Sequence, residues 1–354
     1  MSGRIIRREA CCYSSEEQAV LNADCPIFLR PAWYQMFDRF VRGPDGNTLS
    51  LCLHSEGEPA GYLPLYETRG GLSRCLYSLT NFYSPAFDLI GIKNPESGHY
   101  ADFVRRFRRF FSNFERIDFS PLTAQQAEAW QQAFAAIGFQ GFVYRKSTNW
   151  FHDDISDLAT YWNDRPSRLR NTIKRKADKL HKSGGFEVGV VAPDSEIALW
   201  KYLAHYHRVY YSSWKRAEPF PAFIDAIAEY AWQLGQLRMG MVYHDGEPVA
   251  GQIWFVCQQR AYIFKLAHRP EYSNYSVGTI LSKAMFDYVI ERDRVIYIDF
   301  LTGNDRYKAD WMSGKRGLYG IQLCNSRTVG GAAYAARNIV SGWYKRFSRT
   351  DSQR

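Results

Sequence analysis

A turn of small residues stands directly before an apolar helical pattern in the second half of the sequence. The turn is Ser276-Val277-Gly278-Thr279, and the apolar residues of 280–289 that come next fit one buried face of a helix. The first amide N–H groups of a helix have no partner within it, and the helix dipole adds partial positive charge there. We therefore predict that this turn can bind a diphosphate group.

The surrounding sequence predicts the strands that would position this turn. Apolar runs at 241–243 and 253–256 flank Asp245-Gly246-Glu247, a typical hairpin turn. A third strand is expected at 261–267, before the turn, and a last strand that includes Asp299 lies beyond the helix. The order is therefore a hairpin, a third strand, a small-residue turn, a helix and a final strand.

The first half of the chain repeats part of this pattern. Residues 50–67 and 239–256 share an apolar strand, an acidic Gly-Glu-Pro turn and a second strand after an Ala-Gly step. This similarity suggests a duplicated unit, although any two hairpins with such turns look alike. After the third apolar stretch, at 75–79, Pro85 and bulky neighbours replace the small-residue turn. We expect a degenerate N-terminal domain and an active C-terminal one.

Composition indicates a globular protein that interacts with anions. The chain has 354 residues, of which 46% are hydrophobic and 23% charged, and a formal net charge of +9. This length suits two domains, expected at 1–150 and 151–325, followed by a basic helical tail at 326–354. The charge suits a nucleotide, RNA or an acidic membrane surface. No segment has the roughly 20 apolar residues of a membrane span, so we expect a cytoplasmic protein that could dock to a membrane-associated synthase.

The cysteines and histidines carry no metal-binding pattern. The seven cysteines show no C-x-x-C spacing, and we expect them to be reduced and mostly buried. His205 and His207 are two apart on a predicted helix and point to different faces. We therefore expect no metal cofactor.

A basic amphipathic helix is predicted between the two halves. Leu169, Ile173, Ala177 and Leu180 form one apolar stripe within residues 167–180, and the remaining surface carries Arg and Lys. Such a face can bind RNA or an anionic substrate, or it can simply be solvated. No exposed aromatic residues are interleaved with these charges, so we favour the solvated face.

Three segments of the second half resemble a known family. Residues 212–255 (SSWKRAEPFPAFIDAIAEYAWQLGQLRMGMVYHDGEPVAGQIWF), 262–281 (YIFKLAHRPEYSNYSVGTIL) and 297–312 (YIDFLTGNDRYKADWM) are similar to the CelD-like acyltransferases of the GNAT N-acyltransferase superfamily. Residues 168–188 are similar to a helix of the Fem peptidyltransferases, which are tandem GNAT folds. The resemblance implies an α/β fold with a mixed sheet in two tandem GNAT-like domains, the N-terminal one degenerate.

The resemblance also implies a donor site for acetyl-CoA or another acyl-CoA. In this superfamily the diphosphate lies on a Q/R-x-x-G-x-G/A turn, and here Ser273, Ser276 and Gly278 occupy the three motif positions. The Arg is missing, which leaves the affinity for the donor and its identity open. The backbone of the third strand is the expected edge for the pantetheine arm. The expected donor-binding residues are Lys265, Leu266, Ala267, Tyr275, Ser276, Val277, Gly278 and Thr279.

Candidate catalytic residues cluster at and after the last strand. Asp299 lies within an apolar run, where an acid normally has either a chemical role or a local partner, and both remain open. Tyr307 and Lys308 lie just past the strand end, a usual place for ligand contacts. In the loop between two predicted helices, Trp214, Lys215 and Glu218 are candidates for substrate binding.

Three functions are compatible with these features. The favoured one is an N-acyltransferase that moves an acyl group from acyl-CoA to an amine-bearing small molecule or glycan precursor, in polysaccharide or envelope metabolism. The second is a Fem-type aminoacyl-tRNA-dependent transferase, for which no long coiled-coil insertion is apparent; nucleic acid is otherwise not expected as a partner. The third is a non-catalytic binding module of a polysaccharide synthesis system.

Overall fold

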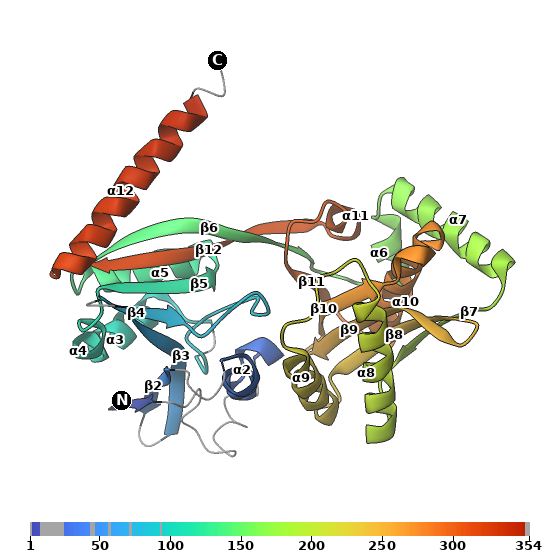
Figure 1. Ribbon diagram of the computed structural model, residues 1–354, viewed down its shortest axis with the longest axis horizontal. Coiled ribbons are helices and arrows are strands. Elements are labelled where there is room, and N and C mark those ends of the chain that lie inside the picture. The colour runs from blue at the N-terminus through green and yellow to red at the C-terminus, as the bar shows by residue number, and fades with distance from the viewer. Residues whose placement is uncertain are drawn as a thin grey trace. The chain divides into compact units, whose positions relative to one another are not determined.

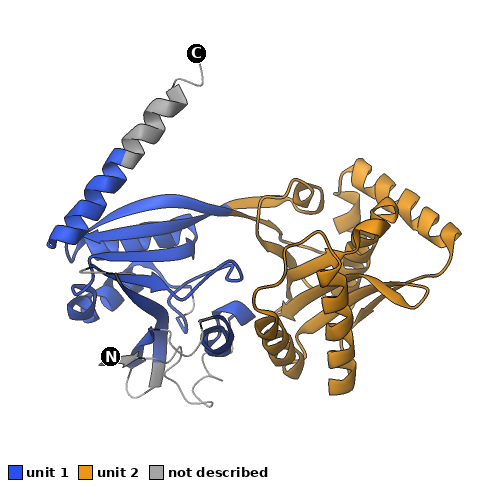
Figure 2. Cartoon of the chain, viewed as in Figure 1, with its two compact units in different colours: residues 1–147, 317–354 blue, residues 148–316 orange. Residues whose placement is uncertain are grey.

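The chain divides into two compact units. The computed structural model describes residues 2–7, 25–42, 47–55, 58–70, 73–92 and 94–350. The first unit comprises residues 1–147 and 317–354, and the second comprises residues 148–316 (Figure 2). Two strands, β6 (Phe139–His152) and β12 (Gly314–Asn325), have residues in both units.

The second unit is built on a mixed sheet with the strand order β6-β11-β10-β9-β8-β7 (Figure 1). The sequence predicted its central hairpin. All pairs along this order are antiparallel except β10 with β11, which is parallel. The remaining strands are β7 (Phe186–Val191), β8 (Leu237–His244), β9 (Glu247–Cys257), β10 (Arg260–His268) and β11 (Tyr297–Thr302).

Helices cover both faces of this sheet because successive apolar side chains along its strands point to opposite faces. On β8, Val242 belongs to the core that includes Leu281 and Met285 of α10, whereas Met241 lies close to Tyr206 of α8. A Cβ on Gly240 would lie 2.6 Å from the Met285 sulfur, so α10 packs this closely only over a glycine. The helices are α6 (Leu158–Asn163), α7 (Ser167–Ser183), α8 (Glu196–Tyr211), α9 (Pro221–Gln233), α10 (Val277–Glu291) and α11 (Lys308–Trp311).

The first unit holds the other half of the same 12-stranded sheet and has its own core. Along the sheet the order is β1-β2-β3-β4-β5-β12, and α3 and α5 pack over an aromatic-rich core with Phe103, Phe119 and Trp130. The strands are β1 (Ser2–Arg7), β2 (Thr48–Ser55), β3 (Glu58–Gly70), β4 (Ser73–Ser78) and β5 (Arg116–Leu122). The helices are α2 (Pro31–Phe37), α3 (Ser97–Arg106), α4 (Arg108–Phe111), α5 (Ala124–Ala135) and α12 (Val329–Thr350), and short helical turns lie at η1 (Ile27–Leu29) and η2 (Asp38–Arg42).

The two units repeat the same arrangement of strands. In the β2–β3 hairpin the register shifts between Leu53 and His54, and in β8–β9 it shifts at the matching place, between Val242 and Tyr243. Each hairpin is followed by a third antiparallel strand that pairs in parallel with a later one at three positions, 75–77 with 116–118 and 260–262 with 297–299. The predicted mixed α/β fold with an internal repeat is therefore confirmed.

In the first unit, β4 and β5 stay joined beyond their three parallel pairs, whereas β10 and β11 of the second unit separate there. Beyond its last parallel pair, Ser78 Oγ donates to Ser120 O (2.9 Å) and accepts from Ser120 N (3.1 Å). Thr80 Oγ1 donates to the same carbonyl (2.6 Å), and the backbone N–H of Phe87 donates to Pro121 O (2.9 Å). These contacts join β4 and the segment after it to the end of β5, as expected for a degenerate copy.

Two expectations need correction. Cys52 is disulfide-bonded, whereas Cys75, Cys257 and Cys324 are buried thiols that form no disulfide. Sequence spacing does not reveal which sulfur atoms a fold brings within bonding distance, so the expectation of seven reduced thiols was wrong. In α7, Leu169, Ile173 and Leu180 are buried, but Ala177 is exposed because the adjacent Lys176 lies nearer the packed side.

Candidate functional site

The second unit opens where strands β10 and β11 part. They pair only from Arg260 to Tyr262 against Tyr297 to Asp299. Immediately afterwards the register of β10 against β9 shifts between Ile263 and Lys265, so Phe264 is an extra, bulged residue. Leu301 of β11 has a positive φ of 55°. The two strands therefore diverge, and a pocket lies between their ends.

This pocket has a volume of about 280 Å³ and combines aromatic walls with lysines. Ligand pockets for drug-sized molecules span roughly 300–1,000 Å³, so this one suits a small group. The loop between α8 and α9 contributes two of the predicted substrate-binding residues, and the segment after β11 contributes two of the predicted catalytic ones. The lining residues are Trp214, Lys215, Ile263, Phe264, Leu266, Phe300, Thr302, Asp305, Tyr307 and Lys308.

Two lysines that are far apart in the sequence line the pocket. Lys215 Nζ donates to Leu266 O (2.5 Å), and Lys308, only 5% exposed, donates to Thr302 O (3.2 Å). Burial, and then the charge of the neighbouring Lys265, lower the pKa of Lys215 to about 8, while the charges of Asp305 and Glu218 partly oppose this shift. Asp305 lies 3.2 Å from Lys308 Nζ and is the pocket's carboxylate.

The third predicted substrate-binding residue, Glu218, lies behind the pocket lining. Its Oε2 accepts from Lys265 Nζ at 2.5 Å, and the two side chains are only 3% and 13% exposed. Burial lowers the pKa of Lys265, and the hydrogen bond and charge of Glu218 oppose this shift. The Lys265 side chain is therefore part of an ion pair beneath the pocket. At the opening, the edge of β10 presents backbone groups to a ligand.

The predicted anion-binding turn forms the start of α10. A short 3-10 turn, η3 (Pro270–Tyr275), precedes it, and Ser276 adopts a left-handed conformation with φ 53°. The amides of Thr279 and Ile280 turn back to Ser276 O, whereas Val277 and Gly278 occupy the first positions of the helix, where geometry supplies no carbonyl partner. The amides needed for an anion site are thus present.

His268 connects this turn to the pocket. Its ring lies 4.4 Å from that of Trp214, and a Cβ on Gly278 would lie 3.1 Å from its Nδ1. Burial lowers the pKa of His268, and the charge of Lys215 lowers it further, so the ring is neutral at pH 7. The helix start, His268, Trp214 and the pocket therefore form one continuous series of contacts.

Two lysines from α7 reach the turn in place of the missing arginine. Lys176 Nζ donates to Asn274 O (2.6 Å), and Lys179 Nζ lies 3.5 Å from the same oxygen. Lys179 also lies 4.8 Å from the ring centroid of Tyr275. This role was not predicted from the sequence, because the lysines are almost a hundred residues away from the turn. Their positions on one side of a basic helix were the available signal.

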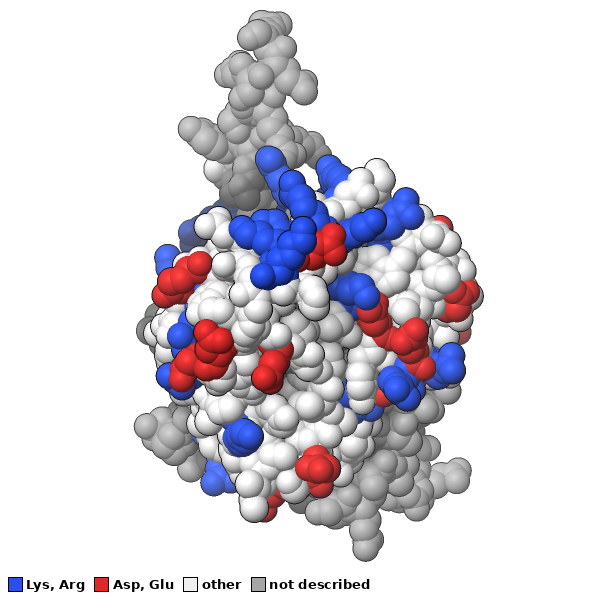
Figure 3. Space-filling model, turned by 90° about the vertical axis from the view of Figure 1, so that its right-hand side faces the viewer, with Lys and Arg blue, Asp and Glu red and all other residues white. Residues whose placement is uncertain are grey.

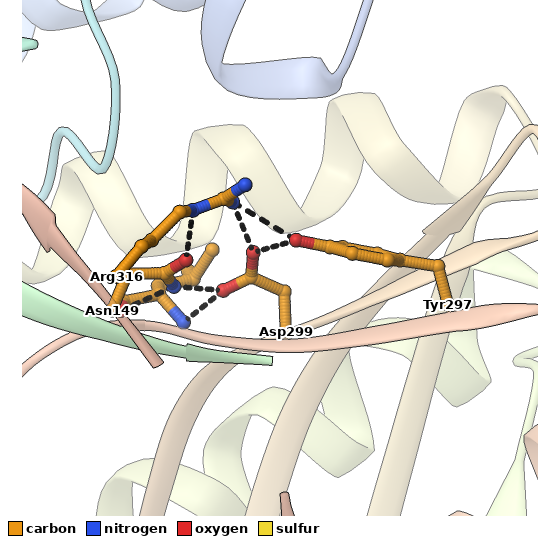
Figure 4. A network of polar contacts seen from close by, with 5 residues as sticks. Asn149, Tyr297, Asp299 and Arg316 are labelled. Atoms are coloured by element: carbon orange, nitrogen blue, oxygen red, sulfur yellow. Dashed lines mark hydrogen bonds and ion pairs between the residues drawn. The ribbon is translucent and has the colours of Figure 1, made fainter. Parts of the chain in front are cut away.

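Asp299, which is 4% exposed, is held by a polar network with Asn149, Tyr297 and Arg316 (Figure 4). Its Oδ1 accepts from Asn149 Nδ2 (2.5 Å) and the amide of Leu301 (2.6 Å). Oδ2 accepts from Tyr297 OH (2.8 Å) and lies 3.3 Å from Arg316 Nη2. Burial raises its pKa, and these partners oppose the rise. Both oxygens are occupied, and this geometry favours the structural role of Asp299 over proton abstraction.

The outer face of α7 is strongly basic. Figure 3 shows Lys and Arg side chains clustered on the side of the molecule where α7 lies. Arg168 is paired with Asp310, whereas Lys174, Arg175, Lys179 and Lys182 line an open groove of about 480 Å³ together with Asp178. This groove has an excess of positive charge and is open to solvent.

The histidines that stood out in the sequence have protein partners. His205 Nδ1 contacts Tyr243 OH (2.8 Å), and His207 Nε2 contacts Asp225 (2.6 Å). Across the residues with assigned positions, no group of three His, Cys, Asp or Glu side chains could hold a metal ion. Within the same part of the chain, no helix has the length and apolar character needed to cross a bilayer.

Comparison with known proteins places this site in a recognised domain. Residues 167–309 match the family model described as an acetyltransferase (GNAT) domain. Among solved structures, FemX has a TM-score of 0.60 at 9% identity, covering 91% of this chain and 97% of FemX. No protein with a curated description matches the sequence significantly.

Two further structures share the fold over most of their length. The C-terminal domain of a candidate lysylphosphatidylglycerol synthetase from Agrobacterium fabrum has a TM-score of 0.54 at 12% identity, covering 92% of this chain and 96% of that domain. L-PGS from Bacillus licheniformis has a TM-score of 0.52 at 10% identity, with coverages of 93% and 97%. Identities this low show the fold alone. Within the second unit, residues 167–309 are therefore similar to the acetyltransferase (GNAT) domain family.

Proposed function

We propose that this protein transfers an acyl group from acyl-CoA to an amine. The observation that carries the proposal is the opening between β10 and β11, which leads to a pocket and lies next to the start of α10. The GNAT domain match over these elements supports an acyl donor and an amine acceptor. The segments that resemble CelD-like enzymes include all three elements, so we assign the protein to that branch.

The donor would lie along β10. Its diphosphate would accept from the amides of Val277 and Gly278, with the ammonium groups of Lys176 and Lys179 supplying the charge of the missing arginine. The backbone of residues 265–267 would bind the pantetheine arm on the edge that β11 leaves free. The thioester would then lie at the pocket.

In the reaction, the amine nitrogen bonds to the thioester carbonyl carbon and the carbon–sulfur bond breaks. The products are an amide and CoA, whose sulfur leaves as a thiolate and takes up the proton that the nitrogen releases. Holding the two reactants together can supply much of the rate enhancement. Asp305 would accept this proton from the nitrogen and pass it on to the thiolate, and Tyr307 and Lys308 would orient the acceptor. Asp299 would act as a positioning residue at the point where β11 diverges from β10.

Isothermal titration with acetyl-CoA and longer acyl-CoAs tests the donor site. Gly278→Asp adds a negative charge at the helix start and a Cβ 3.1 Å from His268, so we expect at least a tenfold loss of affinity. Gly98→Asp is the matched control, because Gly98 is the second residue of α3 as Gly278 is of α10, and its Cβ would meet nothing within 4 Å. If the wild-type chain binds no acyl-CoA, the proposed donor is wrong, and a non-catalytic binding module becomes the favoured function unless the chain binds tRNA.

A second candidate function is a Fem-type transfer that uses aminoacyl-tRNA. The basic groove of α7 is the observation that favours it, since lysines and arginines on one helix face bind phosphate backbones. Replacing Lys174, Arg175 and Lys182 with Glu would abolish salt-sensitive tRNA binding while leaving acetyl-CoA binding intact. Absence of tRNA binding by the wild-type chain at low salt, about 50 mM, would exclude this function.

A further inference from the structure

The pocket between β10 and β11 carries uncompensated positive charge inside aromatic walls. Lys215 and Lys308 contribute two ammonium groups, and Asp305 contributes one carboxylate that is 61% exposed. The nearby Lys265 adds no net charge because Glu218 pairs with it. The pocket therefore has an excess of one positive charge at neutral pH.

The protein partners of these lysines do not cancel that charge. Lys215 donates to the neutral carbonyl of Leu266. Lys308 donates to the neutral carbonyl of Thr302 and also pairs with Asp305, 3.2 Å away, so the one carboxylate that lines the pocket already faces one of its two lysines. Aromatic rings lie close by, with Lys308 Nζ 5.5 Å from the Phe300 centroid and Lys215 Nζ 5.8 Å from that of Trp214. Charge is costly in such surroundings unless an opposite charge accompanies it. An anionic group on the ligand would remove this cost.

We propose that the acceptor is an amino acid or similar amine that bears a carboxylate beside its nitrogen. Lys308 and Lys215 bind the carboxylate, Asp305 faces the amine, and the aromatic walls hold an apolar side chain. This inference rests on the proposed acyl transfer and narrows its acceptor class. A pocket of about 280 Å³ admits such a molecule, and its positive charge disfavours amino sugars that carry no anionic group.

Product analogues test the carboxylate site without requiring turnover. We would titrate the full chain at pH 7 with N-acetyl-L-phenylalanine and with N-acetyl-L-phenylalaninamide, in which a neutral carboxamide of similar size replaces the carboxylate. Charge-assisted hydrogen bonds to lysine should make the acid bind about tenfold tighter or more. Equal affinity for the two, or binding of neither, would overturn the proposal.

Variants test whether the pocket causes the tighter binding of the acid. Lys308→Met keeps the length of the side chain and should abolish the preference for the acid, whereas Lys315→Met removes the same charge from an exposed site over the Trp150 ring and should keep it. Asp305→Asn, at an exposed carboxylate, should leave acid binding unchanged or tighter. Retained preference in Lys308→Met together with weakened acid binding in Asp305→Asn would place the anion elsewhere and sink the proposal.

Turnover assays separate this inference from the general function. With acetyl-CoA as donor, L-phenylalanine should be acetylated at least tenfold more efficiently than L-phenylalaninamide or glucosamine, as judged by kcat/KM. Transfer that favours glucosamine would preserve the acyltransferase function and refute the acceptor class. Preferential binding of the acid without any acetyl-CoA binding would support the carboxylate site and refute the acyltransferase function.

Discussion

Lys215 should destabilise the folded protein at neutral pH, and Lys215→Met should therefore make it more stable. The ammonium is largely buried near Lys265 and Lys308, and its pKa falls from 10.5 to about 8. One pKa unit corresponds to about 1.4 kcal/mol, so keeping this lysine charged costs the folded state roughly 3 kcal/mol at pH 7. Methionine removes that cost but gives up a hydrogen bond to Leu266 O, worth about 1 kcal/mol. The expected net gain is about 2 kcal/mol.

The pH dependence distinguishes this mechanism from a simple packing effect. Because the pKa of Lys215 is lower in the folded state, the unfolded chain binds more protons between about pH 8 and 10.5. Stability of the wild type therefore rises through that window relative to the variant, and the cost is present in full only below it. The advantage of Lys215→Met should shrink from about 2 kcal/mol at pH 7 to nothing near pH 10.

Urea denaturation of both chains at several pH values measures this difference. Lys201→Met is the matched control, since Lys201 lies on the exposed face of α8, and it should change the free energy of unfolding by less than about 0.5 kcal/mol at every pH. A Lys215→Met variant that is less stable at pH 7, or whose advantage is independent of pH, would refute the reasoning. The same variant should bind N-acetyl-L-phenylalanine more weakly, because its stability is gained at the ligand site.

Three further predictions concern the buried polar groups and the donor. Asp299→Asn places an amide among donors and should lower the free energy of unfolding by about 3 kcal/mol in thermal melts, whereas a general-base role predicts lost kcat with unchanged Tm. Glu218→Gln leaves Lys265 buried without its anion and should cost about 3–5 kcal/mol in urea denaturation, while a loss below about 1 kcal/mol would show that water reaches the pair. Acetyl-CoA at about one hundred times its Kd should stabilise the wild type by about 2.7 kcal/mol. At the same concentration it should stabilise Gly278→Asp less than the wild type and Gly98→Asp as much as the wild type. Equal stabilisation of all three chains would show that the donor binds elsewhere.

Local sequence was sufficient for elements whose signals lie within a few residues. The hairpin turn at 245–247, the small-residue start of α10 and the basic helix α7 each carry their own pattern, and the structure has all three. The candidate residues Trp214, Lys215, Tyr307 and Lys308 also meet in one pocket. They could be chosen because loops and strand ends are where sheets of this kind present functional side chains.

Contacts between distant segments could not be read in the same way. Asp299 contacts Asn149, which is 150 residues away, and Lys176 reaches Asn274 across 98 residues. Neither pairing has a periodicity or a turn signal that links its members. The choice between base and structural acceptor for Asp299 therefore depended on donors that only the folded sheet brings together.

The repeat itself gives an independent reason to assign Asp299 a structural role. The tripeptide Ile-Asp-Phe occurs at the same register in both copies, as residues 117–119 and 298–300, and each aspartate is the last residue paired with the preceding parallel strand. In the closed first unit, Asp118 accepts from Tyr144 OH at 2.7 Å, although Ser78 and Ser120 join the strands there. An aspartate that is present whether or not the strands open cannot be explained by catalysis alone. The opening depends instead on residues beyond the paired segment: the bulge at Phe264 and the positive φ of Leu301 part the strands of the second unit, whereas the Ser78–Ser120 contacts hold those of the first together.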